Sequence, residues 1–138
     1  MKIGILITGH TPDRLANEFG SYGDMFENLL QDETFTFEQY TVLEGDFPEL
    51  SACDGYVITG SKFGVYDCLG WIQRLEEFIR NCFKKDIPIA GFCFGHQIMA
   101  QAMGGVVEKF SGGWDVGHKT YNLNWEAKSG SISVMAWH

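Results

Sequence analysis

A cysteine with a glycine two positions away on each side stands in the segment 91–95, which reads GFCFG. This G-x-C-x-G pattern has the form of the G-x-S-x-G nucleophile elbow, with sulfur in place of oxygen. Such an elbow is a tight strand-to-helix turn, and flanking glycines leave room for it. The turn would lift the Cys93 thiol to the start of a helix, where the dipole and unpaired N–H groups favour the thiolate. The pattern therefore predicts that Cys93 is a nucleophile.

An attacking thiolate also needs hydrogen-bond donors for the oxyanion that forms. The backbone N–H of Phe94, the residue after the nucleophile, is the first expected donor. The segment 57–61, which reads VITGS, is expected to supply a second, because Gly60 lets backbone approach the reacting carbonyl closely. An ordinary glycine turn after a strand gives the same pattern, and this segment alone does not separate the two.

Hydrophobic periodicity predicts the elements that must position these residues. Strands are expected at 2–8, 34–42, 55–60, 87–92, 118–124 and 131–137, and helices at 22–31, 71–85 and 94–103. Asp24 is the expected cap of the first helix. Alternating strands and helices predict an α/β fold, flavodoxin-like or Rossmann-like, whose mainly parallel sheet has helices on both faces in three αβα layers. Ligand sites in such sheets lie beyond the carboxyl ends of the strands, where the loops 8–13, 59–64 and 91–96 begin.

Composition narrows the class of protein. A chain of 138 residues with 45% hydrophobic and 20% charged residues fits one globular domain over 1–138. It has neither a membrane-length apolar run nor a signal-peptide pattern. The net charge of −8 argues against nucleic acid or an anionic membrane as a partner. Acidic residues concentrate between Asp13 and Asp54, where Arg14 is the only base. This segment predicts a solvated face, with a docking surface for a basic partner as the alternative.

The other cysteines lack the glycine bracket. Cys53, Cys68 and Cys82 are expected to be small buried hydrophobes. The four cysteines form no CxxC pair, and none has a histidine at metal-ligand spacing, so no metal site is predicted. Without a secretion signal, reduced thiols in the cytoplasm are expected.

At this point the sequence resembles the class I glutamine amidotransferases, in particular stand-alone proteins similar to the amidotransferase domain of GMP synthase. The resemblance spans essentially the whole chain. It rests on ITGS at 58–61, GFCFGHQIMAQAMGG at 91–105, SGGWDVG at 111–117 and VMAWH at 134–138.

What the resemblance implies is a set of residue roles. Cys93 would attack the side-chain amide of glutamine, His138 would be its base, and the N–H groups of Phe94 and the Gly60 region would hold the oxyanion. The substrate contacts implied are Ser61, Gln97, Gly113 and Trp114, and no metal or organic cofactor is implied. The loop 111–114 suits a zwitterion because it is rich in backbone N–H and C=O groups, although a plain turn fits it equally well.

The chain has four histidines, and His138 is the expected base. It follows an apolar strand, so it lies at a strand end where a base from a separate element can reach the thiolate. His10 is expected to be a polar loop residue, His118 to be structural or exposed, and His96 to lie on the helix body away from the thiol.

The family pattern places a glutamate two residues after the base, and the sequence stops at His138. We therefore expect a C-terminally truncated domain whose His138 lacks the carboxylate that fixes its tautomer. Low glutamine turnover is expected for this chain.

Hydrolysis of the glutamine side-chain amide through a γ-glutamyl thioester on Cys93 is the leading functional hypothesis. It releases glutamate and ammonia, and in the family the ammonia is often passed to a synthase domain or partner. Two alternatives stay open. One is a γ-glutamyl peptidase or hydrolase that uses the same Cys-His site. The other is a non-catalytic binding or regulatory module, which the missing carboxylate favours.

Overall fold

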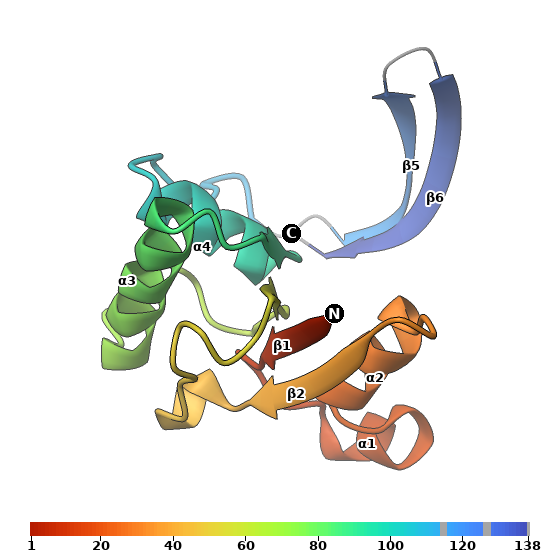
Figure 1. Cartoon of the computed structure of the whole chain (residues 1–138). Coiled ribbons are helices and arrows are strands. Elements are labelled where there is room, and N and C mark those ends of the chain that lie inside the picture. Colours follow the sequence, from red (N-terminus) through yellow and green to blue (C-terminus); the bar gives the residue numbers. More distant parts are fainter. Residues whose placement is uncertain (114–115, 126–127, 138) are drawn as a thin grey trace. The chain divides into compact units, whose positions relative to one another are not determined.

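The computed structural model describes residues 1–113, 116–125 and 128–137. The chain divides into two compact units, Met1–Glu108 and Lys109–His138. The first unit contains a four-stranded sheet with its helices, and the second contains a two-stranded hairpin (Figure 1). The single domain expected over 1–138 stays a prediction.

The sheet of the first unit is parallel throughout. Its strands are β1 (Lys2–Leu6), β2 (Thr36–Tyr40), β3 (Gly55–Ile58) and β4 (Ile89–Gly91), in the order β2-β1-β3-β4. The helices are α1 (Asp13–Phe19), α2 (Tyr22–Leu30), α3 (Gly70–Lys84) and α4 (Phe94–Ala102), with a short 3₁₀ helix, η1 (Val42–Glu44). The predicted parallel α/β fold is confirmed.

Helices cover both faces of this sheet, in three layers. Figure 1 shows α1 and α2 on one side of the strands and α3 and α4 on the other. Alternate residues of a strand point to opposite faces. Accordingly, Tyr56 and Ile58 belong to the core shared with α3 and α4, whereas the buried Val57 between them does not.

The longest helix has the apolar stripe that the sequence predicts. The buried residues of α3 are Ile72, Leu75, Phe78, Ile79 and Cys82. Phe83, which follows Cys82 directly, is 44% exposed because the packed stripe ends at Cys82 in the last helical turn.

The start of α2 differs from its predicted form. Ser21 is the N-cap, and its hydroxyl accepts the N–H of Asp24 at 3.0 Å. The Asp24 carboxylate in turn accepts the N–H of Ser21 at 2.8 Å. The two residues form a capping box, so Asp24 is its third helical residue and not the cap itself. Helix α1 was not predicted from the sequence; it begins at Asp13, where the expected loop 8–13 ends.

The second unit is an antiparallel hairpin of β5 (Val116–Trp125) and β6 (Lys128–Trp137). Its register runs from the pair Val116 and Trp137 to the pair Trp125 and Lys128. The two strands expected from the sequence in this region are confirmed.

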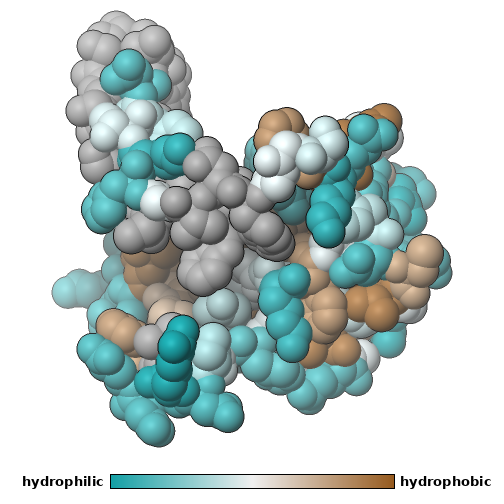
Figure 2. Space-filling model, turned by 180° about the vertical axis from the view of Figure 1, so that it is seen from behind, coloured by the Kyte–Doolittle hydropathy of each residue, from teal (hydrophilic) through white to brown (hydrophobic). Residues whose placement is uncertain are grey.

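Most carboxylates of the acidic segment between Asp13 and Asp54 are exposed, as both the solvated face and the alternative docking surface require. Figure 2 shows hydrophilic residues spread over one face of the molecule, with smaller hydrophobic patches between them. Within the described residues, no helix is long and apolar enough to cross a membrane. The described part of the chain likewise has no cluster of three or more His, Cys, Asp or Glu placed to hold a metal ion.

We predict an alkaline loss of stability that originates at Cys82. Its side chain is fully buried, and burial raises the pKa of the thiol from 9.0 to about 11. The pKa of this thiol is higher in the folded protein than in the unfolded chain. Its contribution to the free energy of unfolding is therefore complete below the pKa of the unfolded chain, and it is lost as the pH rises through the pKa of the folded protein. The free energy of unfolding should therefore fall between about pH 9 and about pH 11.

The measurement is urea unfolding at about pH 8 and about pH 10.5, for the wild type and for Cys82→Ala. The variant should lose about 1 kcal/mol at the lower pH, because a small cavity replaces the thiol. It should then lose less than the wild type on going to the higher pH. An equal pH-dependent loss in both proteins would contradict the assignment to Cys82.

Candidate active site

The segment 91–95 forms a strained strand-to-helix turn. Strand β4 ends at Gly91, helix α4 begins at Phe94, and Cys93 is the helix N-cap with φ 54° and ψ −107°. These angles are close to those of the first central residue of a type II′ turn, a position that glycine favours. Among the described non-glycine residues, Asp86 shares this positive φ, and no other does. A strained, exposed cysteine at such a joint has the geometry of a nucleophile elbow.

The surrounding backbone holds this conformation. The N–H of Phe92 donates to the carbonyl of Ile58 in β3 at 3.0 Å, which ties the elbow to the neighbouring strand. The N–H of Gln97 donates to the carbonyl of Cys93 at 3.1 Å, which is the first bond of α4. The strain at Cys93 is therefore maintained by the strand before it and the helix after it.

The two glycines that bracket the cysteine have different roles. A Cβ on Gly91 would lie 2.3 Å from the carbonyl carbon of Gly95, so the turn itself excludes a side chain there. A Cβ on Gly95 would lie 2.5 Å from the carbonyl oxygen of Ile58, so this glycine lets α4 pack directly on β3. Gly91 is therefore required by the turn, and Gly95 is required by the packing of α4 on β3.

Gly60 lies beside the nucleophile. A Cβ placed on Gly60 would be 3.8 Å from the Cβ of Cys93. The two residues come together because β3 and β4 are adjacent parallel strands whose carboxyl ends share one edge of the sheet. Within the described ranges, neither the N–H of Gly60 nor the N–H of Phe94 makes a hydrogen bond. Both groups are therefore free to receive an oxyanion.

Aromatic side chains fix the elbow on both faces of the sheet. On one face, the centroid of the buried Phe94 ring lies 5.5 Å from that of Trp71. The Trp71 centroid in turn lies 5.9 Å from that of Phe63, in the loop after β3. On the other face, the Phe92 ring packs edge-on against Phe26 of α2 at 5.0 Å. This support was not predicted from the sequence, although the phenylalanines on either side of Cys93 were an available signal.

Two of the implied substrate-binding residues lie in the first unit. The Ser61 hydroxyl donates to the carbonyl of Thr8 at 2.6 Å and accepts the N–H of Phe63 at 3.2 Å. A substrate contact from Ser61 would therefore use its backbone. Gln97 lies in the first turn of α4, and its side chain has no hydrogen bond to any residue that the structure describes. It is free to contact a ligand.

The remaining expected site residues lie elsewhere in the chain. Gly113 is an exposed residue of the second unit, with φ 89°. Trp114 and the expected base, His138, lie outside the described residues. The structure thus brings together Cys93, Phe94, Gly60, Ser61 and Gln97 in the first unit.

Among the other histidines and cysteines, the structure contradicts one prediction, the burial of a cysteine. His10 pairs with Glu44 at 3.3 Å in an exposed position, and His96 and His118 are exposed. Cys53 and Cys82 are buried as predicted, and burial raises the pKa of both thiols. The predicted burial of Cys68 is wrong: it lies exposed in the loop between β3 and α3, off the packed stripe of α3.

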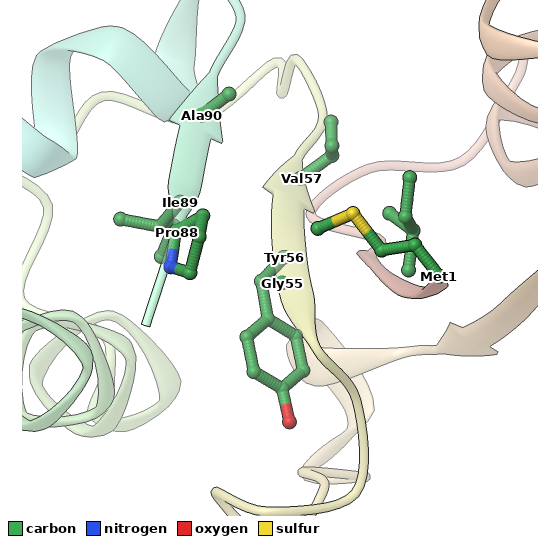
Figure 3. A pocket seen from close by; sticks show the side chains of 8 residues that line it. Met1, Gly55, Tyr56, Val57, Pro88, Ile89 and Ala90 are labelled. Atoms are coloured by element: carbon green, nitrogen blue, oxygen red, sulfur yellow. The ribbon is translucent and has the colours of Figure 1, made fainter. Parts of the chain in front are cut away.

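An apolar hollow of about 200 Å³ lies away from these residues, at the amino ends of β1, β3 and β4 (Figure 3). Its lining consists of Met1, Ile3, Gly55, Tyr56, Val57, Pro88, Ile89 and Ala90. The Tyr56 hydroxyl, its one polar side-chain group, donates to the carbonyls of Glu49 and Leu50. The lining of this hollow thus offers no nucleophile or base.

A parallel α/β sheet with a strained, exposed cysteine between a strand end and a helix start, at its carboxyl edge, is the arrangement of a nucleophile elbow. The chain belongs to the class I glutamine amidotransferase family: the sequence model described as "Glutamine amidotransferase class-I" matches residues 21–135. The resemblance seen in the motifs is thereby confirmed.

The individual relatives include proteins named γ-glutamyl peptidase and proteins named GMP synthase. The chain is 35% identical over 104 residues to γ-glutamyl peptidase 4 of Arabidopsis thaliana, covering 72% of this chain and 41% of that protein. It is 33% identical over 98 residues to one of the subunits of the glutamine-hydrolyzing GMP synthase of Archaeoglobus fulgidus, covering 69% of this chain and 47% of that protein. The chain thus spans about half the length of the curated relatives it matches.

A solved structure has the same fold. The crystal structure of a glutamine amidotransferase from Thermotoga maritima aligns with a TM-score of 0.74 at 21% identity, covering 99% of this chain and 60% of that one. This likeness agrees with the predicted flavodoxin-like arrangement of a mainly parallel sheet between helices.

Proposed function

We propose that this chain carries the nucleophile of a cysteine-dependent hydrolase that cleaves the side-chain amide of glutamine. The observation that carries the proposal is the position of Cys93. It is exposed, strained at a helix N-terminus, and placed with its Cβ against Gly60 at the carboxyl edge of the sheet. Membership of the class I glutamine amidotransferase family supports the choice of substrate.

The proposed reaction has two halves. In the first, the Cys93 thiolate attacks the amide carbon, and the N–H groups of Phe94 and Gly60 donate to the oxyanion. The C–N bond then breaks, ammonia leaves with a proton from the base, and a γ-glutamyl thioester is left on Cys93. In the second half, water attacks the thioester carbon, the C–S bond breaks, and glutamate is released.

The base and the substrate clamp are proposed on the family pattern. His138 would protonate the leaving ammonia and then deprotonate the water. The Gln97 side chain and the backbone of Gly113 and Trp114 would hold the α-amino and carboxylate groups of glutamine. Ammonia would pass to a synthase partner, which the GMP synthase relative supports, and the unpaired cysteines suit a cytoplasmic location.

A γ-glutamyl peptidase is the second candidate, favoured by the relatives that carry that name. It would use the same thioester, with an amino acid or a larger amine leaving in place of ammonia. The two candidates differ in the leaving group alone, so Cys93 and the oxyanion donors would have the same roles in both.

The test compares two substrates on the full chain. We expect Cys93-dependent release of ammonia from glutamine to exceed release of free amino acid from a γ-glutamyl dipeptide, with Cys93→Ala as the blank. Faster cleavage of the dipeptide would favour the peptidase. If neither substrate is consumed above the blank and no γ-glutamyl adduct forms on Cys93, the chain is a binding or regulatory module and the hydrolase proposal is wrong.

A further inference from the structure

Two buried threonines join the ends of β1 and β3. Thr8 and Thr59 are both fully buried, and buried polar groups are costly unless they are hydrogen-bonded. The N–H of Thr8 donates to Oγ1 of Thr59 at 3.0 Å, and the two hydroxyl oxygens lie 3.1 Å apart. Each strand end thus supplies the partner that the other needs.

The Thr8 hydroxyl also contacts the two carbonyls that flank the amide groups of the candidate oxyanion loop. Its Oγ1 lies 3.0 Å from the carbonyl oxygen of Thr59 and 3.0 Å from that of Gly60. A hydroxyl has one proton, which these two acceptors share, and its lone pairs can accept the Thr59 hydroxyl. In return, the Ser61 hydroxyl donates to the carbonyl of Thr8 at 2.6 Å. We call Thr8, Thr59 and Ser61 the hydroxyl network.

These contacts set the orientation of two peptide planes. In a trans peptide the C=O and N–H groups point in opposite directions. Since the carbonyls of Thr59 and Gly60 both face the Thr8 hydroxyl, the N–H groups of Gly60 and Ser61 both point away from it. Gly60 is the residue that lies against Cys93, so the hydroxyl network determines how its donor is presented beside the nucleophile.

The loops after β1 and β3 are in close contact, so the position of the first directly limits the position of the second. A Cβ on Gly9 would lie 3.2 Å from the carbonyl oxygen of Gly60 and 3.3 Å from the Cα of Ser61. The backbone after β1 therefore supports the backbone after β3 without an intervening side chain, and the loop 59–61 has little freedom to turn.

We propose that Thr8 is a positioning residue for acyl transfer: its hydroxyl holds the Gly60 and Ser61 N–H groups in the orientation that an oxyanion needs. This inference rests on the proposed function for its catalytic consequence. Its structural part, the orientation of the two amides, stands on the hydrogen bonds alone.

The test uses Thr8→Val, which removes the hydroxyl at nearly constant shape, and Thr8→Ser, which keeps it. Acylation of Cys93 is followed by release of p-nitroaniline from γ-glutamyl p-nitroanilide. Alkylation of Cys93 by iodoacetamide, a displacement that forms no oxyanion, serves as the internal reference. Loss of one oxyanion donor typically costs about 10²–10³-fold. We expect Thr8→Val to lose at least about 10²-fold in acylation at an unchanged alkylation rate, and Thr8→Ser to restore most of it.

Thr59→Val tests whether the loss of any buried hydroxyl slows acylation, or the loss of the Thr8 hydroxyl in particular. It removes the acceptor of the Thr8 N–H and the longer contact of the Thr59 hydroxyl with the Gly60 carbonyl, at 3.3 Å, but it leaves the Thr8 hydroxyl against both carbonyls. Its loss of acylation should therefore be the smaller. In ¹H–¹⁵N spectra, the Gly60 and Ser61 amide signals should shift in Thr8→Val and stay close to wild type in Thr8→Ser. If Thr8→Val does not fold, Thr8→Ala carries the same expectation.

The outcomes are distinguishable from failure of the proposed function. If the wild type does not acylate, the hydrolase proposal fails, and the amide shifts alone decide the role of Thr8. Acylation by folded Thr8→Val at the wild-type rate, or unchanged Gly60 and Ser61 amide signals, would overturn the inference.

Discussion

Valine at Gly60 is expected to abolish acylation of Cys93 while the first unit stays folded. A Cβ at this position would meet the Cβ of Cys93 at 3.8 Å, so the added methyl groups of valine would crowd the gap between the proposed oxyanion donor and the nucleophile. The φ of Gly60 lies outside the left-handed region, so valine adds no backbone strain there. We expect a loss of at least about 10²-fold in p-nitroaniline release from γ-glutamyl p-nitroanilide. The cost in unfolding free energy should be about 1 kcal/mol or less.

Gly95→Val is the matched control, because it places the same side chain on the other side of the elbow. Its Cβ would lie 2.5 Å from the carbonyl oxygen of Ile58 and 2.9 Å from the Cβ of Ile58, so α4 must move off β3. Overpacking of this kind costs about 3 kcal/mol or more, and we expect urea unfolding to show it. The account would be wrong if Gly60→Val acylated normally, or if Gly95→Val were as stable as the wild type.

Glycine and alanine at Cys93 are expected to be equally inactive but unequally stable. Loss of a catalytic nucleophile costs on the order of 10⁶-fold in the subtilisin precedent, so both variants should hydrolyse neither glutamine nor a γ-glutamyl dipeptide. Alanine keeps the penalty of about 1–2 kcal/mol that an L-residue pays at positive φ, whereas glycine relieves it. Part of that gain is offset by the larger unfolded-state entropy of glycine, about 0.5–1 kcal/mol.

Cys93→Gly should therefore exceed Cys93→Ala in unfolding free energy by about 1 kcal/mol, measured by urea unfolding of both variants. Asp86, the other described non-glycine residue at positive φ, provides a reference pair in Asp86→Gly and Asp86→Ala. A difference at Asp86 but none at Cys93 would mean that the elbow is not strained in solution.

The local features of the site follow from the sequence. The glycine spacing around Cys93 predicts the elbow, because the tight turn excludes a side chain at Gly91, where a Cβ would meet the backbone of Gly95. The apolar stripe of α3 likewise predicts its buried face. Such features depend on neighbours in the chain, and a single sequence is enough to read them.

Apart from the expected approach of the Gly60 segment to Cys93, contacts that join distant segments were not predicted. The hydroxyl network pairs Thr8 with Thr59, and only the parallel register of β1 against β3 brings them together. The exposure of Cys68 depends on the path of a loop with no periodic pattern. The capping box of α2 was a missed local signal, since Ser21 precedes Asp24 by the three residues that this motif requires.

The most direct test of the central claim, that Cys93 is the nucleophile toward γ-glutamyl amides, is to map the residue that becomes acylated. The full chain is incubated with γ-glutamyl p-nitroanilide, quenched in acid, digested and analysed by mass spectrometry. We predict one γ-glutamyl adduct, on the peptide that contains Cys93, and none on Cys53, Cys68 or Cys82. Acylation of the exposed Cys68 to the same extent as Cys93, or acylation that persists in Cys93→Ala, would contradict the account.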